Sequence, residues 1–214
     1  MEVQEVTRGS GILLAGSSLP SPYGIGTLGD AARQFVDLLV DLKQKYWQIL
    51  PVGPTSYGDS PYQTMSAFAG SPYLIDLDEL IEDGLLTKDE ISCYNWGQDE
   101  STIDYAILFD NRFRVLHQAF ERFDESDSGY QQFLNENADW IEDYGLFMAL
   151  KETNGNERWQ NWPEEIKKKQ PVALAKCRKA LYNNIRFWAF CQYKFFEQWS
   201  RLREYANTKG VQLI

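Results

Sequence analysis

The sequence predicts an α/β fold in which a short parallel sheet is followed by a long helical segment. Two short apolar runs, residues 11–15 and 46–50, flank one amphipathic helix and form a strand–helix–strand unit. Such a unit implies parallel strands, because parallel neighbours need a long crossover connection. From about residue 78 to residue 209, apolar side chains recur at helical spacing.

The strand candidates are short and bounded by turn residues. Residues 11–15 form an apolar run between small residues, which is typical of a buried strand. Residues 46–50 predict a second strand that stops at Pro51. Residues 73–77 are a third extended candidate.

The crossover helix is expected to cover about four turns after Asp30, which can cap it. One apolar face carries Ala31, Phe35, Leu38 and Leu42, with Ala32, Val36 and Leu39 beside it. Later helical faces include the set Ile103, Ala106, Phe109, Phe113, Leu116 and Phe120.

The last helical stripe runs from Leu181 to Ala206 in steps of three or four, and Gly210 is a natural C-terminal stop. Residues 211–214 then begin an apolar run that resembles the first half of a strand. We therefore expect the chain to be the front portion of a longer polypeptide. The alternative is a short edge strand at a true C-terminus.

Composition excludes several classes of function. The chain has 31 acidic and 21 basic residues, and this negative charge disfavours nucleic-acid partners. No run approaches the ~18 apolar residues of a membrane span, and the acidic N-terminus leads us to expect no secretory signal. Three cysteines without C-x-x-C spacing and the single histidine, His117, argue against a metal site. We expect a cytoplasmic protein without metal, cofactor or membrane contact.

The loop after the second strand candidate is the most unusual segment. It contains Asp59, Ser60, Pro61, Tyr62 and Gln63, at the carboxyl end of a strand where α/β proteins gather ligands. Tyrosine rings stack on apolar faces, and hydroxyl and amide groups bond to ligand hydroxyls, so the mixture suits a sugar. The alternative is a rigid surface turn in which Asp59 bonds its own backbone and Pro61 fixes φ.

Two other features carry less weight. Gly24, Gly26 and Gly29 have the spacing of a dinucleotide fingerprint, but the strand that this motif needs is not joined directly to them. His117 lies beside the apolar face of its helix, which predicts a buried or half-buried structural histidine.

Several motifs together resemble the 4-α-glucanotransferases, known as amylomaltases or disproportionating enzymes. The resemblance extends from about residue 8 to the end and is most specific over residues 47–70. One departure is Ala15-Gly16, where many members carry His-Pro. The matching stretches are residues 17–26, 47–51, 57–63, 66–70, 143–151, 162–165 and 187–214.

The resemblance implies the N-terminal part of a (β/α)8 barrel with a large helical insertion. Residues 1–77 would supply the first strands and their loops, residues 78–209 the insertion and a barrel helix, and residues 210–214 the next strand. It also implies transfer of α-1,4-glucan segments between maltooligosaccharides or starch-type glucans by a retaining two-step mechanism without a cofactor. The family's catalytic carboxylates would follow Ile214, so none is expected in this chain, which should be inactive alone.

By resemblance, Tyr62 would stack on a sugar ring, Ser60 and Gln63 would border the site, and Tyr57 would belong to a nearby glucan-contact surface. Asp59 and Pro61 would structure the loop. The alternative function is a non-catalytic helical module that binds α-glucans or another protein. Poor solubility is expected, because a partial barrel leaves strand edges and apolar faces uncovered.

Overall fold

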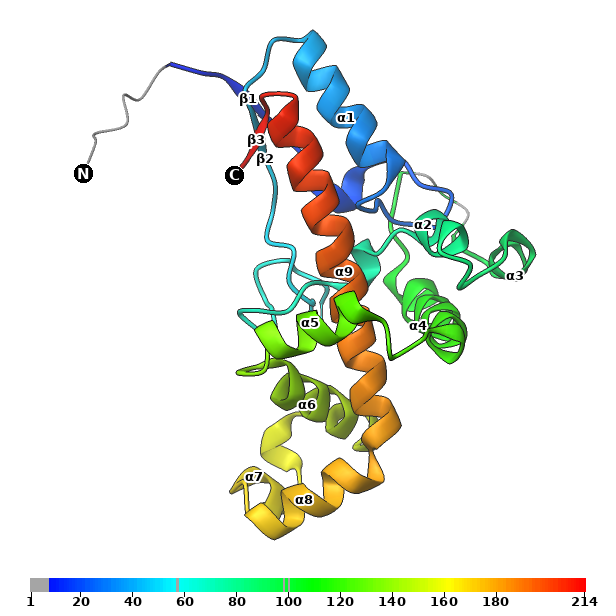
Figure 1. Cartoon of the computed structure of the whole chain (residues 1–214), viewed down its shortest axis with the longest axis vertical. Coiled ribbons are helices and arrows are strands. Elements are labelled where there is room, and N and C mark those ends of the chain that lie inside the picture. The colour runs from blue at the N-terminus through cyan, green and yellow to red at the C-terminus, as the bar shows by residue number, and fades with distance from the viewer. Residues whose placement is uncertain (1–7, 57, 98, 100) are drawn as a thin grey trace.

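The computed structural model describes residues 8–56, 58–97, 99 and 101–214. One long helix, α9 (Tyr182–Thr208), runs along most of the length of the molecule, with the strands near one of its ends (Figure 1). Its 27 residues span about 40 Å at the rise of an α-helix. Segments that are far apart in the sequence therefore share α9 as a common support.

Three parallel strands form the sheet in the described part of the chain, in the order β1 (Gly11–Leu13), β2 (Tyr46–Gln48) and β3 (Gln212–Leu213). In the register, Ile12 lies opposite Trp47, which in turn lies opposite Leu213. The two N-terminal strand predictions are confirmed, and the apolar run after Gly210 pairs with β2 as a strand.

The two faces of the sheet have different environments. Register partners share a face, so Ile12, Trp47 and Leu213 lie together under α1 (Asp30–Asp41) and α9. Trp47 is buried there, and its ring meets that of Phe35 edge-on with 4.8 Å between centroids. Leu13 faces the other way and is 57% exposed. Because parallel sheets are normally covered on both faces, this second face is unusual.

Helix α1 buries a different stripe from the one that its sequence favours. Ala32, Val36 and Leu39 are buried, whereas Leu38 and Leu42 are exposed. The two stripes lie side by side on the helix, and only the position of α9 and the sheet decides which of them is covered. Asp30 does not cap the helix either: Gly29 occupies that position, and Asp30 pairs with Arg33 instead.

The prediction of a third strand at residues 73–77 is wrong. Pro72–Leu74 forms the single 3-10 turn η2, and Asp76 then caps α2 (Leu77–Glu82) by accepting from the Glu79 amide at 3.0 Å. No strand lies beside this segment in the described residues.

Donors from neighbouring helices replace the missing strand partner. The guanidinium of Arg112 donates to the carbonyl oxygens of Tyr73 and Ile75, and Arg112 is fully buried. The apolar run at 73–77 is therefore explained by burial between helices and not by strand pairing.

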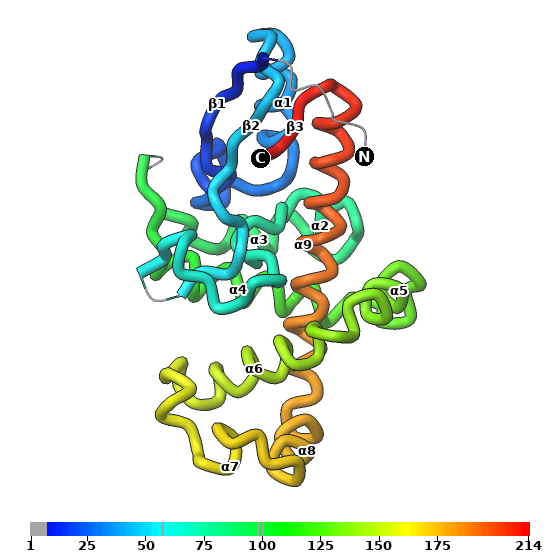
Figure 2. The backbone as a smooth tube through the Cα atoms, turned by 90° about the vertical axis from the view of Figure 1, so that its left-hand side faces the viewer, coloured from blue at the N-terminus to red at the C-terminus, as the bar shows by residue number. Residues whose placement is uncertain are grey.

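The remaining helices form the layer predicted from helical spacing. α6, α7 and α8 lie at the end of α9 away from the strands, and the loop after β2 lies between these two regions (Figure 2). No helix in the described ranges is both long and apolar enough to cross a membrane. The bounds are α3 (Lys88–Ser92), α4 (Tyr105–Arg122), α5 (Ser128–Glu136), α6 (Ile141–Thr153), α7 (Glu164–Lys167) and α8 (Pro171–Ala180), with 3-10 turns η1 (Gly16–Ser18) and η3 (Trp159–Asn161).

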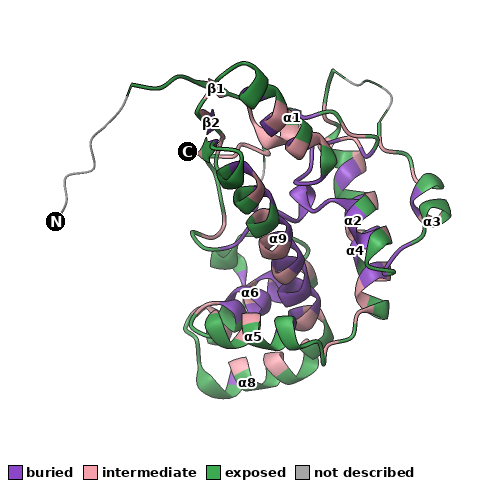
Figure 3. Cartoon of the chain, turned by 45° about the horizontal axis from the view of Figure 1, so that its top comes forward, coloured by how far each residue is buried: buried purple, intermediate pink, exposed green. Residues whose placement is uncertain are grey.

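Buried side chains concentrate along α9 and the helices that contact it (Figure 3). Phe187, Phe190 and Phe195 of α9 are almost completely buried. The helix ends where Gly210 adopts a φ of 77°, and the chain then turns into β3. Helix α9 therefore contributes to one continuous core that extends from the sheet to the helical layer.

Candidate functional site

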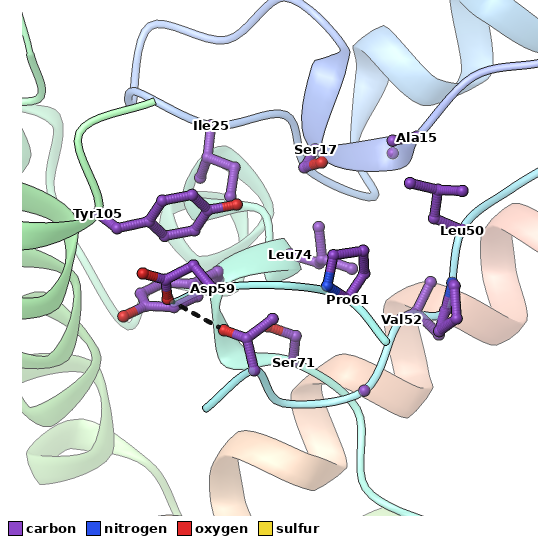
Figure 4. Close-up of a pocket in the computed structure, with 15 residues that line it drawn as sticks. Ala15, Ser17, Ile25, Leu50, Val52, Asp59, Pro61, Ser71, Leu74 and Tyr105 are labelled. Atoms are coloured by element: carbon purple, nitrogen blue, oxygen red, sulfur yellow. Dashed lines mark hydrogen bonds between the residues drawn. The ribbon is translucent and has the colours of Figure 1, made fainter. Parts of the chain in front are cut away.

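Two long loops leave the carboxyl ends of β1 and β2. Residues 14–29 follow β1, and we call residues 51–71, which follow β2, the tyrosine loop. Parallel strands end at one edge of a sheet, so the two loops meet there, where α/β proteins build ligand sites. Figure 4 shows side chains of both loops around a small hollow, with Asp59 and Tyr105 of α4 at one end and Leu50 and Val52 at the other.

The tyrosine loop folds back on itself as a short hairpin. Thr55 and Thr64 form an antiparallel bridge, and the Ser56 amide donates to the Gln63 carbonyl at 3.1 Å. The Gln63 amide in turn donates to the Ser60 carbonyl at 3.0 Å. Backbone bonds thus fix the base of the turn that carries Tyr62.

Asp59 shapes the tip of this hairpin. Its φ is 53° and that of Gly58 is 92°, in the left-handed region that aspartate tolerates better than most residues. The Asp59 amide donates to the Ser56 carbonyl at 3.0 Å, and its carboxylate accepts from the Thr55 hydroxyl at 3.3 Å (dashed in Figure 4). Both contacts of Asp59 lie within its own hairpin, and its loop-structuring role stays a prediction. Pro61, predicted for the same role, lines the small hollow.

The residues predicted to bind substrate lie together at the tip, but they do not enclose a cavity. Tyr62 is 73% exposed, Gln63 is exposed, and Ser60 is half-buried with its hydroxyl accepting from the Tyr62 amide at 3.4 Å. None of these three lines the small hollow or the larger cavity between the loop and the helices. Tyr57 lies outside the described residues. The tip thus presents an exposed ring beside an amide and a hydroxyl group.

A larger cavity of about 870 Å³ adjoins the small hollow and shares Asp59, Tyr73 and Tyr105 with it. It lies between the tyrosine loop, α4, α6 and α9. Apolar and aromatic walls with a few polar groups are typical of ligand pockets. The aromatic and thioether side chains are Met65, Tyr73, Tyr105, Phe109, Phe113, Met148 and Trp188, and the charged or amide side chains are Asp59, Asp110, Lys151, Glu152 and Asn156.

Sequence reasoning missed this aromatic wall. Phe109 and Phe113 fall on a predicted apolar helix face, and a helical pattern does not distinguish a core position from a cavity wall. Phe109 is exposed, and its ring meets that of Phe113 edge-on at 5.5 Å. Trp188 comes from α9, far along the chain. Only the packing of α4 against α9 and the loop brings these rings together.

Burial raises the pKa of three polar groups that line the cavity. It raises the pKa of the Tyr73 and Tyr105 phenols above the ordinary value, and the charge of Asp59 adds to both shifts. Both phenols therefore remain protonated donors at neutral pH. Burial also raises the pKa of the Glu152 carboxyl. Phenol donors beside aromatic faces suit a ligand with hydroxyl groups and apolar faces.

Two of the three carboxylates that line the cavity, those of Asp59 and Glu152, accept hydrogen bonds from neighbouring side chains. Asp59 accepts from Thr55, and Glu152 accepts from the Asn184 amide at 3.4 Å. Retaining glycoside chemistry needs two carboxyl groups about 5–5.5 Å apart, one to attack the sugar as nucleophile and one to act as acid and base. In the ranges described above, no three His, Cys, Asp or Glu side chains are grouped so that they could hold a metal ion.

His117 lies away from both cavities. The prediction of a buried or half-buried histidine is wrong for the residue as a whole, which is exposed. Its ring nevertheless lies flat on Phe187 with 3.6 Å between centroids. Desolvation of the ring lowers the pKa of His117. A position at the edge of the contact between α4 and α9 explains both observations, because Phe187 covers one ring face while the residue as a whole stays exposed.

Comparison with known proteins gives a consistent result. A family model described as 4-alpha-glucanotransferase matches residues 14–214. The chain is 45% identical over 199 residues to the 4-alpha-glucanotransferase of Clostridium butyricum, covering 92% of this chain and 41% of that protein. For the enzyme of Thermus thermophilus, the identity is 42% over 215 residues, covering 98% of this chain and 42% of that protein.

The fold is also similar to that of a solved relative. The amylomaltase from Streptococcus agalactiae, solved in complex with acarbose, superposes with a TM-score of 0.93 at 43% identity, covering 97% of this chain and 42% of that one. The chain therefore corresponds to the N-terminal portion of these proteins and spans about 42% of their length. The family match over residues 14–214 and the shared fold together show that this chain belongs to the 4-alpha-glucanotransferase family.

Proposed function

We propose that this chain forms the N-terminal part of the glucan-binding cleft of a 4-alpha-glucanotransferase. Such an enzyme transfers α-1,4-glucan segments between maltooligosaccharides or starch-type glucans by a retaining two-step mechanism. The observation that carries the proposal is the exposed Tyr62 ring on a backbone-fixed hairpin at the carboxyl edge of the sheet. The acarbose complex of the Streptococcus agalactiae relative supports a ligand of the sugar class.

Each side chain of the tip has a proposed task. Tyr62 stacks on a glucose ring, while Ser60 and Gln63 bond to glucan hydroxyl groups at the border of the site. Tyr57 and the wall that includes Tyr105 and Phe109 form an adjoining glucan-contact surface. Asp59 and Pro61 hold the loop in shape and do not react.

We assign neither the catalytic nucleophile nor the catalytic acid of the transfer reaction to any of the 214 residues of this chain. The contacts of Asp59 and Glu152 described above support this assignment, because both carboxylates already serve the local structure. The chain alone should bind glucans without transferring them. Incubation of the purified chain with maltotriose, followed by an assay for released glucose, tests this. Glucose release above the blank would overturn the assignment.

The binding proposal is tested by titrating acarbose into the purified chain and two variants. Tyr62→Ala should raise the Kd about fivefold or more, because a stacking contact contributes roughly 1 kcal/mol. Tyr62→Phe should retain most of the affinity, since the ring remains. The matched control is Tyr182→Ala, which removes another exposed tyrosine from the first turn of α9. Equal affinity of Tyr62→Ala and the wild-type chain would remove the stacking role.

A further inference from the structure

Helix α9 carries two buried glutamines that make the same unusual pair of contacts. The Gln192 amide accepts from the Gly70 N–H at 2.7 Å and donates to the Gly70 carbonyl at 3.0 Å. The Gln198 amide accepts from the Asp76 N–H at 2.7 Å and donates to the Asp76 carbonyl at 3.1 Å. The two side chains are 0% and 1% exposed. Each glutamine thus substitutes for a strand partner at one residue of the passing chain.

The two contacts differ in what they hold. Gly70 is at the C-terminal foot of the tyrosine loop, next to Ser71, whose amide donates to the Val52 carbonyl at 2.8 Å and closes the loop. Asp76 lies beyond the loop, at the cap of α2. Gln192 therefore acts on the base of the loop, and Gln198 acts on a helix start.

The foot of the loop is held from a second side as well. The ring of Phe195, one turn along α9 from Gln192, occupies the place that a β-carbon on Gly70 would take. Gly70 therefore contacts α9 through both the Phe195 ring and the Gln192 amide, which leaves no room for a side chain at this position. The tip of the loop has fewer anchors, because Tyr62 and Gln63 are exposed. The position of the tip thus depends mainly on the base.

Losing the Gln192 amide would leave a buried N–H and a buried C=O without partners. Such groups destabilise by more than the net value of one hydrogen bond, and the segment that contains them gains from opening towards water. The opening would be local to the tyrosine loop, because the rest of α9 keeps its own contacts with α6 and the sheet.

We infer that Gln192 is a positioning residue: from α9 it sets the base of the tyrosine loop and thereby the place of the Tyr62 ring. Its effect on the loop stands independently of the ligand. Only its effect on glucan affinity rests on the proposed function. Gln198 provides a matched control, because it has the same chemistry and burial and the same pair of backbone contacts but holds a peptide outside the loop.

The experiment compares Gln192→Met and Gln198→Met, which keep side-chain volume and remove the amide. Amide hydrogen exchange is followed at Ser56, Gln63 and Met65, whose N–H groups are bonded within the loop. We expect exchange at these amides to become about tenfold faster or more in Gln192→Met, and to stay near wild-type in Gln198→Met. Loop exchange that responds equally to both substitutions, or to neither, would overturn the inference.

A second variant covers the case in which Gln192→Met fails to fold. A protonated carboxylic acid offers one donor and one acceptor, as the amide does, whereas the carboxylate only accepts. Gln192→Glu should match wild-type loop exchange at about pH 6, where burial keeps the acid protonated, and exceed it at about pH 9. Exchange that exceeds wild-type equally at both pH values would contradict the assignment of paired contacts.

Acarbose titration then separates this inference from the proposed function. If wild-type chain binds acarbose, Gln192→Met should weaken binding severalfold and Gln198→Met should not. Unchanged affinity in Gln192→Met, despite a loosened loop, would overturn the link between the base and the Tyr62 ring. Failure of the wild-type chain to bind, with loop exchange altered as expected, would count against the proposed function and leave the positioning role supported.

Discussion

Asp59 and Glu152 are two carboxylates of one cleft whose surroundings give them different properties. The Asp59 carboxylate accepts a hydrogen bond from Thr55, four residues earlier in the same turn. Glu152 lies on α6, where burial is the main influence on its pKa and raises it. The local role of Asp59 could be anticipated from a Gly-Asp-Ser-Pro turn. The environment of Glu152 could not, because it depends on side chains of α9 such as Trp188.

The raised pKa of Glu152 predicts a pH-dependent cost in stability. The folded state binds this proton more tightly than the unfolded state, so the group's favourable contribution is complete at low pH and is lost as pH rises through the folded pKa. Glu152→Gln should therefore raise the melting temperature at pH 7, by a few degrees at most. The gain should disappear below about pH 4, where the unfolded carboxyl is protonated as well.

Thermal unfolding followed by circular dichroism across this pH range checks the effect. Asp139→Asn is the control, because it removes a charge from an exposed position and should change little at any pH. A melting temperature that is unchanged at pH 7 in Glu152→Gln would show that burial does not penalise this carboxylate.

Among the elements, α4 supplies three of the aromatic side chains that line the cavity, and its first turn depends on a capping residue. The carboxylate of Asp104, five residues before Phe109, accepts from the Ile107 amide at 3.1 Å. Asp104→Ala should cost about 1 kcal/mol of unfolding free energy, whereas Asp104→Asn keeps the acceptor and should cost only a few tenths. Urea denaturation of the two variants measures the difference. Equal losses in both would mean that charge, and not capping, stabilises this helix end.

Helices and strands can be predicted from the sequence where the spacing of apolar residues is compatible with only one of them. The long stripe from Leu181 to Ala206 predicts α9 closely, because a pattern of this length fits only a helix. The strand prediction for residues 73–77 is wrong, since a short apolar run is compatible with any buried backbone. The deciding groups, Arg112 and Gln198, come from helices that no local pattern connects to this segment.

At the scale of the whole molecule, the sheet has one covered and one uncovered face. Leu13 is exposed on the open face, and β1 and β3 form the outer edges of the sheet in the described part of the chain. Exposed strand edges with apolar neighbours favour association between copies. We expect the purified chain to self-associate as its concentration rises, and Leu13→Lys to reduce this.

Light scattering coupled to size exclusion measures the mass over a range of concentrations. Val172→Lys is the control, because Val172 is 70% exposed but lies on α8, away from the sheet. Loss of self-association in both variants would point to net charge and not to the open face. A monomeric mass for the wild-type chain at all concentrations would contradict the expectation itself.

The strand–helix–strand start, the long final helix and the loop motif around Tyr62 can be read from the sequence, because each depends on spacing or on residues adjacent in the chain. Folding selects which stripe of α1 is buried, which rings of α4 and α9 line the cavity, and how Gln192 holds Gly70. Those features depend on contacts between side chains that are distant in sequence. Local periodicity carries no information about such partners, whereas packing against a shared helix fixes them.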